Sequence, residues 1–163
     1  MAKQKAATKQ ALKAELLALL EAQLAALTSA HRAATEGATH EEAKPEHDKD
    51  TRAIEQSYLA RGQAARIEEL QDSVAAVAAL PLRTFGPEDA VTLGALVTLG
   101  QEDGGDLRLW LAPGGGGTRL AGGVQVTTPK SPLGQALLGK QTGDDIDVPA
   151  ARQKRLLTVL RVE

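Results

Sequence analysis

The chain has 163 residues, a single Trp, Tyr and Phe, no cysteine, and a formal net charge of −2 at pH 7. The lack of cysteine excludes disulfides, thiolate catalysis and Cys-ligated zinc or iron–sulfur sites. The near-neutral charge argues against sequence-specific binding to duplex DNA, which needs a strongly basic face. Charged residues interrupt every apolar run near the N-terminus, so neither a signal peptide nor a membrane span is expected.

Residues 1–80 are predicted to form two long helices. The first, from about residue 4 to 35, carries leucines at three- and four-residue spacing, and the second runs from about 48 to 79. Gly62 interrupts the second and indicates close approach to the partner helix or a slight kink. Each helix would be about 45 Å long, which favours an antiparallel hairpin over a globular bundle or a dimerisation coiled coil. The periodic apolar positions are Leu12, Leu16, Leu19, Leu20, Leu24, Leu27, Ile54, Tyr58, Leu59, Ile67, Leu70, Val74 and Val77.

The turn between these helices, residues 36–52, reads EGATHEEAKPEHDKDTR. Gly37 and Pro45 are expected to break the helices there. Lys44 and Lys49 oppose six acids, so the turn is locally acidic. Crowded carboxylates can bind a hard cation such as Mg²⁺, although a solvated polar loop explains the same composition. The acids are Glu36, Glu41, Glu42, Glu46, Asp48 and Asp50.

Glycine, proline, valine and threonine dominate after residue 80, which indicates a second domain. A linker at 81–89 precedes a β-domain at 90–163, with strands predicted at about 90–99, 107–112, 124–128, 145–148 and 156–162. A short helix should begin with Ser131 as N-cap and Pro132 in the first turn, and end at Gly139. Leu133, Leu137 and Leu138 would face the sheet.

Other motifs in the sequence are weak. The glycine run 114–117 lacks a following helix and is interpreted as a mobile hairpin loop. Gly134, Gly139 and Lys140 approach a phosphate-binding pattern, but Gln141 lacks the required hydroxyl. His40 and His47 are interpreted as solvated, and no serine lies in a nucleophile elbow.

The stretch TPKSPLGQALLGKQTGDDIDV resembles the SPxxxALxGKxxGDxxxV signature of GreA/GreB-type transcript cleavage factors. The second helix, DTRAIEQSYLARGQAARIEELQ, is similar to a segment of a divergent branch of that family. Together the matches cover about residues 40–163. The resemblance implies an α+β chain in which an antiparallel coiled coil precedes an FKBP-like antiparallel β-sheet domain with one short helix.

The resemblance also implies a function. Family members insert the coiled coil into the secondary channel of RNA polymerase, where tip acids help to hold an Mg²⁺ ion of the polymerase. The ion stabilises the phosphoryl displacement that cleaves backtracked RNA near its 3′ end. The factor completes the polymerase's nuclease and is not an enzyme alone. A cytoplasmic monomer that meets the RNA only indirectly is expected.

The tip of this chain departs from the family pattern GDLxENxEY. Alignment on the DTR segment assigns the metal role to Glu42 and Glu46, with Glu41 and Asp48 as reserves. Because the tip is unusual, a regulator that occupies the channel without stimulating cleavage remains an alternative, as does a coiled-coil adaptor unrelated to transcription.

The resemblance further implies a set of partner-binding residues. Arg52 and Arg61, with Arg66, are candidates for contacts to polymerase or RNA, although solvated helix positions explain them too. Prolyl isomerase activity is not expected, because such pockets are lined by aromatics and the second half offers only Phe85 and Trp110. The partner-binding set is Ser131, Pro132, Leu133, Gly139, Arg52 and Arg61.

Overall fold

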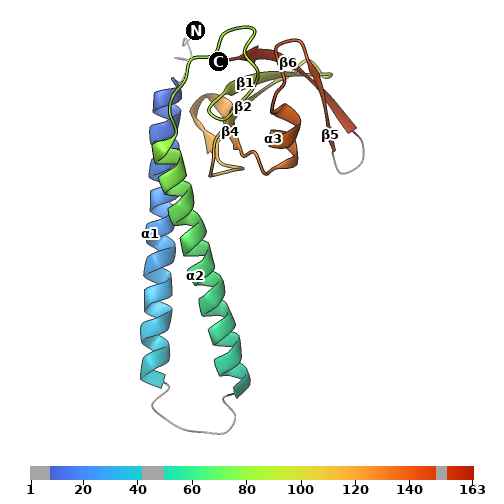
Figure 1. The fold of residues 1–163 in the computed structure, drawn as a ribbon. Helices are drawn as coiled ribbons and strands as arrows, with labels where there is room; N and C mark the ends of the chain where they lie inside the picture. The colour runs from blue at the N-terminus through green and yellow to red at the C-terminus, as the bar shows by residue number, and fades with distance from the viewer. Residues whose placement is uncertain (1–7, 42–49, 150–153) are drawn as a thin grey trace.

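The computed structural model describes residues 8–41, 50–149 and 154–163. Two long helices, α1 (Lys9–Glu41) and α2 (Asp50–Ala79), precede a β-domain that contains one short helix (Figure 1). The domain consists of β1 (Leu96–Gln101), β2 (Asp106–Leu111), β3 (Arg119–Leu120), the 3₁₀ turn η2 (Ala121–Gly123), β4 (Val124–Thr127), α3 (Pro132–Leu137), β5 (Asp145–Pro149) and β6 (Lys154–Val162).

The two long helices form the predicted antiparallel hairpin. Their 33 and 30 residues correspond to lengths of about 50 and 45 Å. Both extend from the β-domain, and the end of α1 and the start of α2 lie at the far end of this arm (Figure 1). The prediction that Gly37 breaks the first helix was wrong, since α1 continues to Glu41. One glycine costs a helix only about 1 kcal/mol, which a long helix tolerates.

The β-domain is a six-stranded sheet in the order β3-β4-β2-β1-β6-β5. All neighbouring strands are antiparallel except β2 and β4, which are parallel. The fold class is therefore confirmed, with one parallel pair that the sequence did not reveal. The short strand β3 was also not predicted. Residues 90–95, expected to begin the first strand, form turns instead, where Gly94 has φ +92°.

Two hydrophobic clusters lie on opposite faces of the sheet. Leu96 pairs with Trp110 across β1 and β2, and Val97 pairs with Leu109. Because successive side chains point to opposite faces, the first pair packs against the helical hairpin and the second against α3. The first cluster contains Leu12, Leu16, Leu20, Leu70, Val77, Leu80, Leu96, Trp110, Ala112, Leu120, Val124 and Val126.

The second cluster includes Phe85, which belongs to the predicted linker 81–89 and is buried among side chains of β1, β2, β6 and α3. Both ends of the hairpin therefore continue directly into packed parts of the β-domain. Within the described residues, neither long helix has an apolar stretch of the kind that crosses a bilayer.

The short helix α3 begins as predicted. The Ser131 hydroxyl accepts a hydrogen bond from the amide of Gly134 at 3.0 Å, and Gly139 adopts the left-handed conformation that ends the helix, with φ +78°. Leu137 is buried and Leu133 is half-buried, but Leu138 is 41% exposed. The prediction that Leu138 faces the sheet was therefore wrong, because the helix ends before its side chain reaches the core.

Candidate functional site

The predicted metal-binding acids lie at the far end of the arm in the sequence. Glu42, Glu46 and Asp48 are outside the described residues, and only the helical backbone of Glu41 is described. Residues 8–41, 50–149 and 154–163 contain no group of three or more His, Asp or Glu that could bind a metal ion. The Mg²⁺ site therefore remains a prediction about the turn itself.

The arm leading to that turn is packed along only part of its length. Leu12, Leu16 and Leu20 are buried at its base, and Leu24 and Leu27 are half-buried further along. Beyond them, Nδ1 of His31 and Oε1 of Gln63 form a hydrogen bond of 3.1 Å between the helices.

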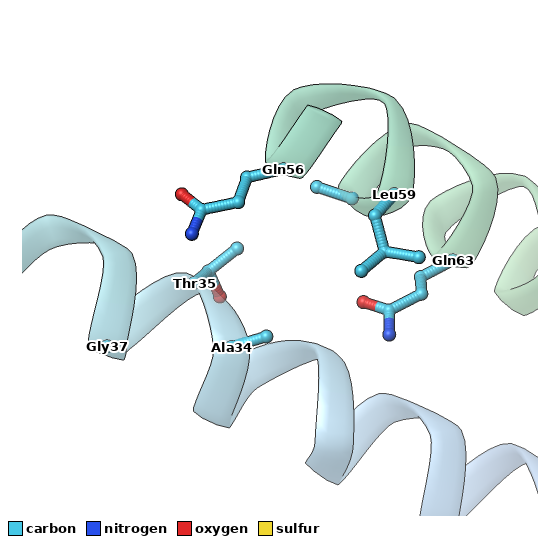
Figure 2. A pocket seen from close by; sticks show the side chains of 7 residues that line it. Ala34, Thr35, Gly37, Gln56, Leu59 and Gln63 are labelled. Carbon is cyan, nitrogen blue, oxygen red and sulfur yellow. The ribbon is translucent and has the colours of Figure 1, made fainter. Parts of the chain in front are cut away.

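Past this bond the two helices no longer pack closely. Ile54, Tyr58 and Leu59, predicted to face the partner helix, are 54%, 67% and 65% exposed. That prediction was wrong, because the facing side chains of α1 are too small to reach across. Figure 2 shows the resulting groove of about 390 Å³, lined by Ala34, Thr35, Gly37, Gln56, Leu59, Ala60 and Gln63.

Arg52 and Arg61 are both exposed on α2, so they can meet a partner without rearrangement. Arg66 is also exposed, and its Nη1 forms an ion pair of 2.8 Å with Glu69 one turn later. Gly62 lies on this solvent-facing side, where an added Cβ would meet nothing within 4 Å. The interpretation of Gly62 as a point of close helix approach was therefore wrong.

The predicted partner-binding residues of the β-domain lie around α3. The Ser131 hydroxyl is occupied by local bonds, since it lies 2.7 Å from Oγ1 of Thr127 and donates to the carbonyl of Thr128. Pro132 and Gly139 are exposed, whereas Leu133 packs against the second cluster. The signature residues thus shape α3 and present only part of their surface to solvent.

Gly134, one turn into α3, is required by close packing. A Cβ at this position would lie 1.9 Å from the carbonyl oxygen of Thr128, well inside van der Waals contact. The glycine is therefore explained by the fold, in agreement with the rejection of a phosphate-binding loop here.

Several polar contacts that the sequence did not reveal fasten the base of the arm to the β-domain. Both carboxylate oxygens of Glu15 accept hydrogen bonds from the amide of Ala121, at 3.1 and 3.0 Å. The ammonium of Lys13 donates to the carbonyl of Leu80 at 2.7 Å. These residues are separated by 106 and 67 positions along the chain, so no local pattern could have paired them.

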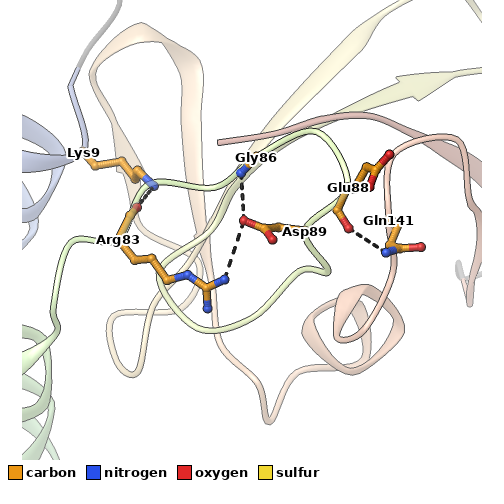
Figure 3. Close-up of polar contacts among 6 residues, drawn as sticks. All are labelled: Lys9, Arg83, Gly86, Glu88, Asp89 and Gln141. Atoms are coloured by element: carbon orange, nitrogen blue, oxygen red, sulfur yellow. Dashed lines mark hydrogen bonds and ion pairs between the residues drawn. The ribbon is translucent and has the colours of Figure 1, made fainter.

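Lys9 makes a further contact at this end of the arm. Its ammonium donates to the carbonyl of Arg83 (Figure 3) and lies 4.6 Å from the ring centroid of Phe85. Desolvation lowers the pKa of Lys9, Glu163 partly opposes this, and the charge of Arg83 lowers the pKa further. Figure 3 also shows Asp89 bonded to the Gly86 amide and paired with Arg83, and Gln141 bonded to the carbonyl of Glu88.

The glycine run between β2 and β3 also contacts the arm. A Cβ on Gly114 would lie 2.7 Å from Cβ of Ser73 on α2, and one on Gly115 would lie 2.7 Å from Cδ1 of Leu16 on α1. The interpretation of this run as a mobile hairpin loop was wrong, because its backbone packs directly on both helices. The same composition serves close backbone approach as well as mobility.

Comparison with known proteins gives the following matches. Residues 86–163 match the family model described as "Transcription elongation factor, GreA/GreB, C-term". No curated protein matches the chain. Gfh1 of Thermus thermophilus is 23% identical with a TM-score of 0.40, over 90% of this chain and 94% of that one.

Two further solved structures are similar at the same level. Gfh1 of Thermus aquaticus is 22% identical with a TM-score of 0.42, over 88% of this chain and 91% of that one. A GreA/GreB factor from Nitrosomonas europaea is 23% identical with a TM-score of 0.39, over 57% of this chain and 78% of that one. The assignment rests on the family model, which covers the whole β-domain, and the chain is accordingly a divergent transcription elongation factor of the GreA/GreB type.

Proposed function

We propose that this factor docks its β-domain at the rim of the RNA polymerase secondary channel and inserts the helical hairpin, so that acids of the turn help to hold an Mg²⁺ ion at the polymerase active site. There the ion would stimulate cleavage of backtracked RNA near its 3′ end. The observation that supports this most is the position of the acidic turn, between the ends of two helices that extend about 45 Å from the family domain.

The chemistry fits the residue types. Two carboxylates lower the cost of recruiting a second divalent cation, and paired cations stabilise the attacking and leaving oxygens of an in-line displacement. We assign the role to Glu42 and Glu46, with Glu41 and Asp48 as reserves. The polymerase supplies the remaining catalytic groups, so the factor is not an enzyme by itself and acts as a monomer in the cytoplasm, where the polymerase transcribes.

A cleavage assay tests this proposal. The factor is added to a stalled, backtracked elongation complex with Mg²⁺, and shortened transcripts are counted. We expect the native chain to raise the cleavage rate and the Glu42→Ala/Glu46→Ala double variant to lose at least about tenfold of that stimulation. Glu21→Ala, an exposed acid on α1, is the matched control and should behave as the native chain.

The departure of the turn from the family pattern favours one second candidate. A regulator that occupies the channel without activating cleavage would bind polymerase while leaving cleavage unchanged or reduced. Capture of polymerase on the immobilised factor separates the cases: binding with stimulation supports the first proposal, and binding without stimulation supports the second. Failure to bind polymerase contradicts both and leaves the coiled-coil adaptor.

A further inference from the structure

The glycine run at the junction between the hairpin and the β-domain has a role that the proposed function does not yet assign. Gly114 and Gly115 lie where the backbone of the β-domain meets both helices of the arm at once. Gly114 faces Ser73 on α2 and Gly115 faces Leu16 on α1. The run therefore sets how closely each helix can approach the sheet.

The loop that carries these glycines is firmly tied to the sheet. The Ala112 amide donates to the carbonyl of Thr127 at 2.9 Å, and the Gly117 amide donates to Val126 at 2.8 Å. Within the loop, the Thr118 amide donates to Gly115 at 3.1 Å. A loop held on both sides cannot recede when a helix presses on it, so a change in loop volume must move the helices.

Two other ties complete the junction. Glu15 on α1 binds the Ala121 amide, and Lys9 lies over the ring of Phe85, which is buried in the β-domain. Three separate contacts fix the direction of a rigid rod, whereas one or two leave it free to pivot. The buried leucines of the first cluster lie between them and add apolar contact.

We propose that Gly114 and Gly115 are positioning residues, which fix the direction of the helical hairpin relative to the β-domain so that the turn reaches a set place when that domain is docked. This inference rests on the proposed function for its consequence, but not for its geometry. For a rod of about 45 Å, a tilt of about 5° moves the far end by about 4 Å. A misplacement of about 1 Å can cost about 100-fold in rate.

Gly114→Ala is the decisive variant. The backbone of Gly114 lies outside the left-handed region, so alanine introduces no backbone strain there. Its Cβ would meet Cβ of Ser73 at 2.7 Å and Cα of Ser73 at 3.0 Å, and a helix backbone cannot rotate away as a side chain can. Gly116→Ala is the matched control, because its Cβ would meet only the Thr128 side chain of the β-domain, at 3.1 Å.

The geometry can be measured on the isolated full-length protein. The chain has no cysteine, so Glu55→Cys on α2 and Glu102→Cys on the β1–β2 turn provide two unique, exposed sites for spin labels. We expect Gly114→Ala to shift the mean distance between the labels by about 2 Å or more, and Gly116→Ala to leave the distance unchanged. A smaller shift in folded Gly114→Ala overturns the proposal.

A second substitution on α2 tests the contact itself. Ser73→Gly removes the Cβ that Gly114→Ala would strike, so the double variant should regain the native distance, whereas Ser73→Ala keeps that Cβ and should not. If Gly114→Ala does not fold, Ser73→Thr adds a methyl from the helix side and should produce the same kind of shift. Failure of Ser73→Gly to restore the distance, or an unchanged distance in Ser73→Thr, contradicts the assignment.

The functional consequence is measured separately. In the cleavage assay, Gly114→Ala should bind polymerase within about twofold of the native chain and lose at least about tenfold of the stimulation, with recovery in the Ser73→Gly double variant. Undiminished stimulation despite a shifted distance would contradict the positioning role. If the native chain itself stimulates no cleavage, the proposed function fails, whereas the distance measurements still decide the geometry.

Discussion

The base and the far half of the helical hairpin have similar sequences and very different surroundings. At the base, Leu12 and Leu16 are fully buried against the sheet. In the far half, Tyr58 and Leu59 are about two-thirds exposed, and a groove separates the helices. The difference teaches that the β-domain supplies much of the order of the arm, since helical periodicity alone does not bury a side chain. Four substitutions test this contrast.

The largest effect is expected at the base. Leu16→Ala removes a fully buried side chain that touches the first cluster and the glycine run, so it should lower the free energy of unfolding by about 2–5 kcal/mol. Leu19→Ala, on the same helix but 39% exposed, should cost less than about 1 kcal/mol. Urea unfolding followed by circular dichroism measures both, and equal losses would remove the contrast.

A smaller loss is expected from the polar tie between the arm and the β-domain. Glu15→Ala leaves the Ala121 amide without its two carboxylate acceptors and should cost about 1–2 kcal/mol, in the range of a hydrogen bond to a charged group. Glu21→Ala is the control on the same helix. Thermal unfolding that treats the two variants alike would show that the tie contributes nothing measurable.

On the exposed side of α2 a gain is expected. Gly62→Ala fills open space and should stabilise the protein by up to about 1 kcal/mol, because alanine is the better helix former. The neighbouring Ala64→Gly should lower stability by a similar amount. Destabilisation by Gly62→Ala, seen in the same unfolding experiment, would mean that a partner approaches this face closely.

The smallest effect is expected in the far half. Leu59→Ala should change the free energy of unfolding by less than about 0.5 kcal/mol, since the side chain is mostly in solvent already. Leu27→Ala, which is half-buried nearer the base, should cost more. A loss above about 1 kcal/mol for Leu59→Ala would indicate that the seam closes in solution.

The sequence predicts the elements well, because the signals for them are local. Leucine spacing identifies the two helices, and the Ser131–Pro132 pair identifies the start of α3. The error at Ile54, Tyr58 and Leu59 arises because the spacing is that of a packed helix, while burial depends on what the other helix offers. The facing positions of α1 are small or polar, and periodicity on one helix does not report this.

The contacts between the two halves of the chain could not be predicted in the same way. A glycine run has the same composition whether it is mobile or packed against a helix, so Gly114 and Gly115 were misread. The Glu15–Ala121 bond joins residues that no sequence pattern relates. For the candidate site, the sequence locates an acidic turn between two helices, and Glu42 and Glu46 remain predictions that the cleavage assay addresses.

The shared core has a consequence for synthesis on the ribosome. The first helix leaves the ribosome early, yet the partners of Leu12, Leu16 and Leu20 include Leu120, Val124 and Val126, and Glu15 waits for Ala121, 106 residues later. At about 5–20 residues per second, the nascent chain displays these leucines to solvent for roughly 5–20 s. Unfinished chains are therefore expected to associate with one another or with chaperones, and finished chains are not.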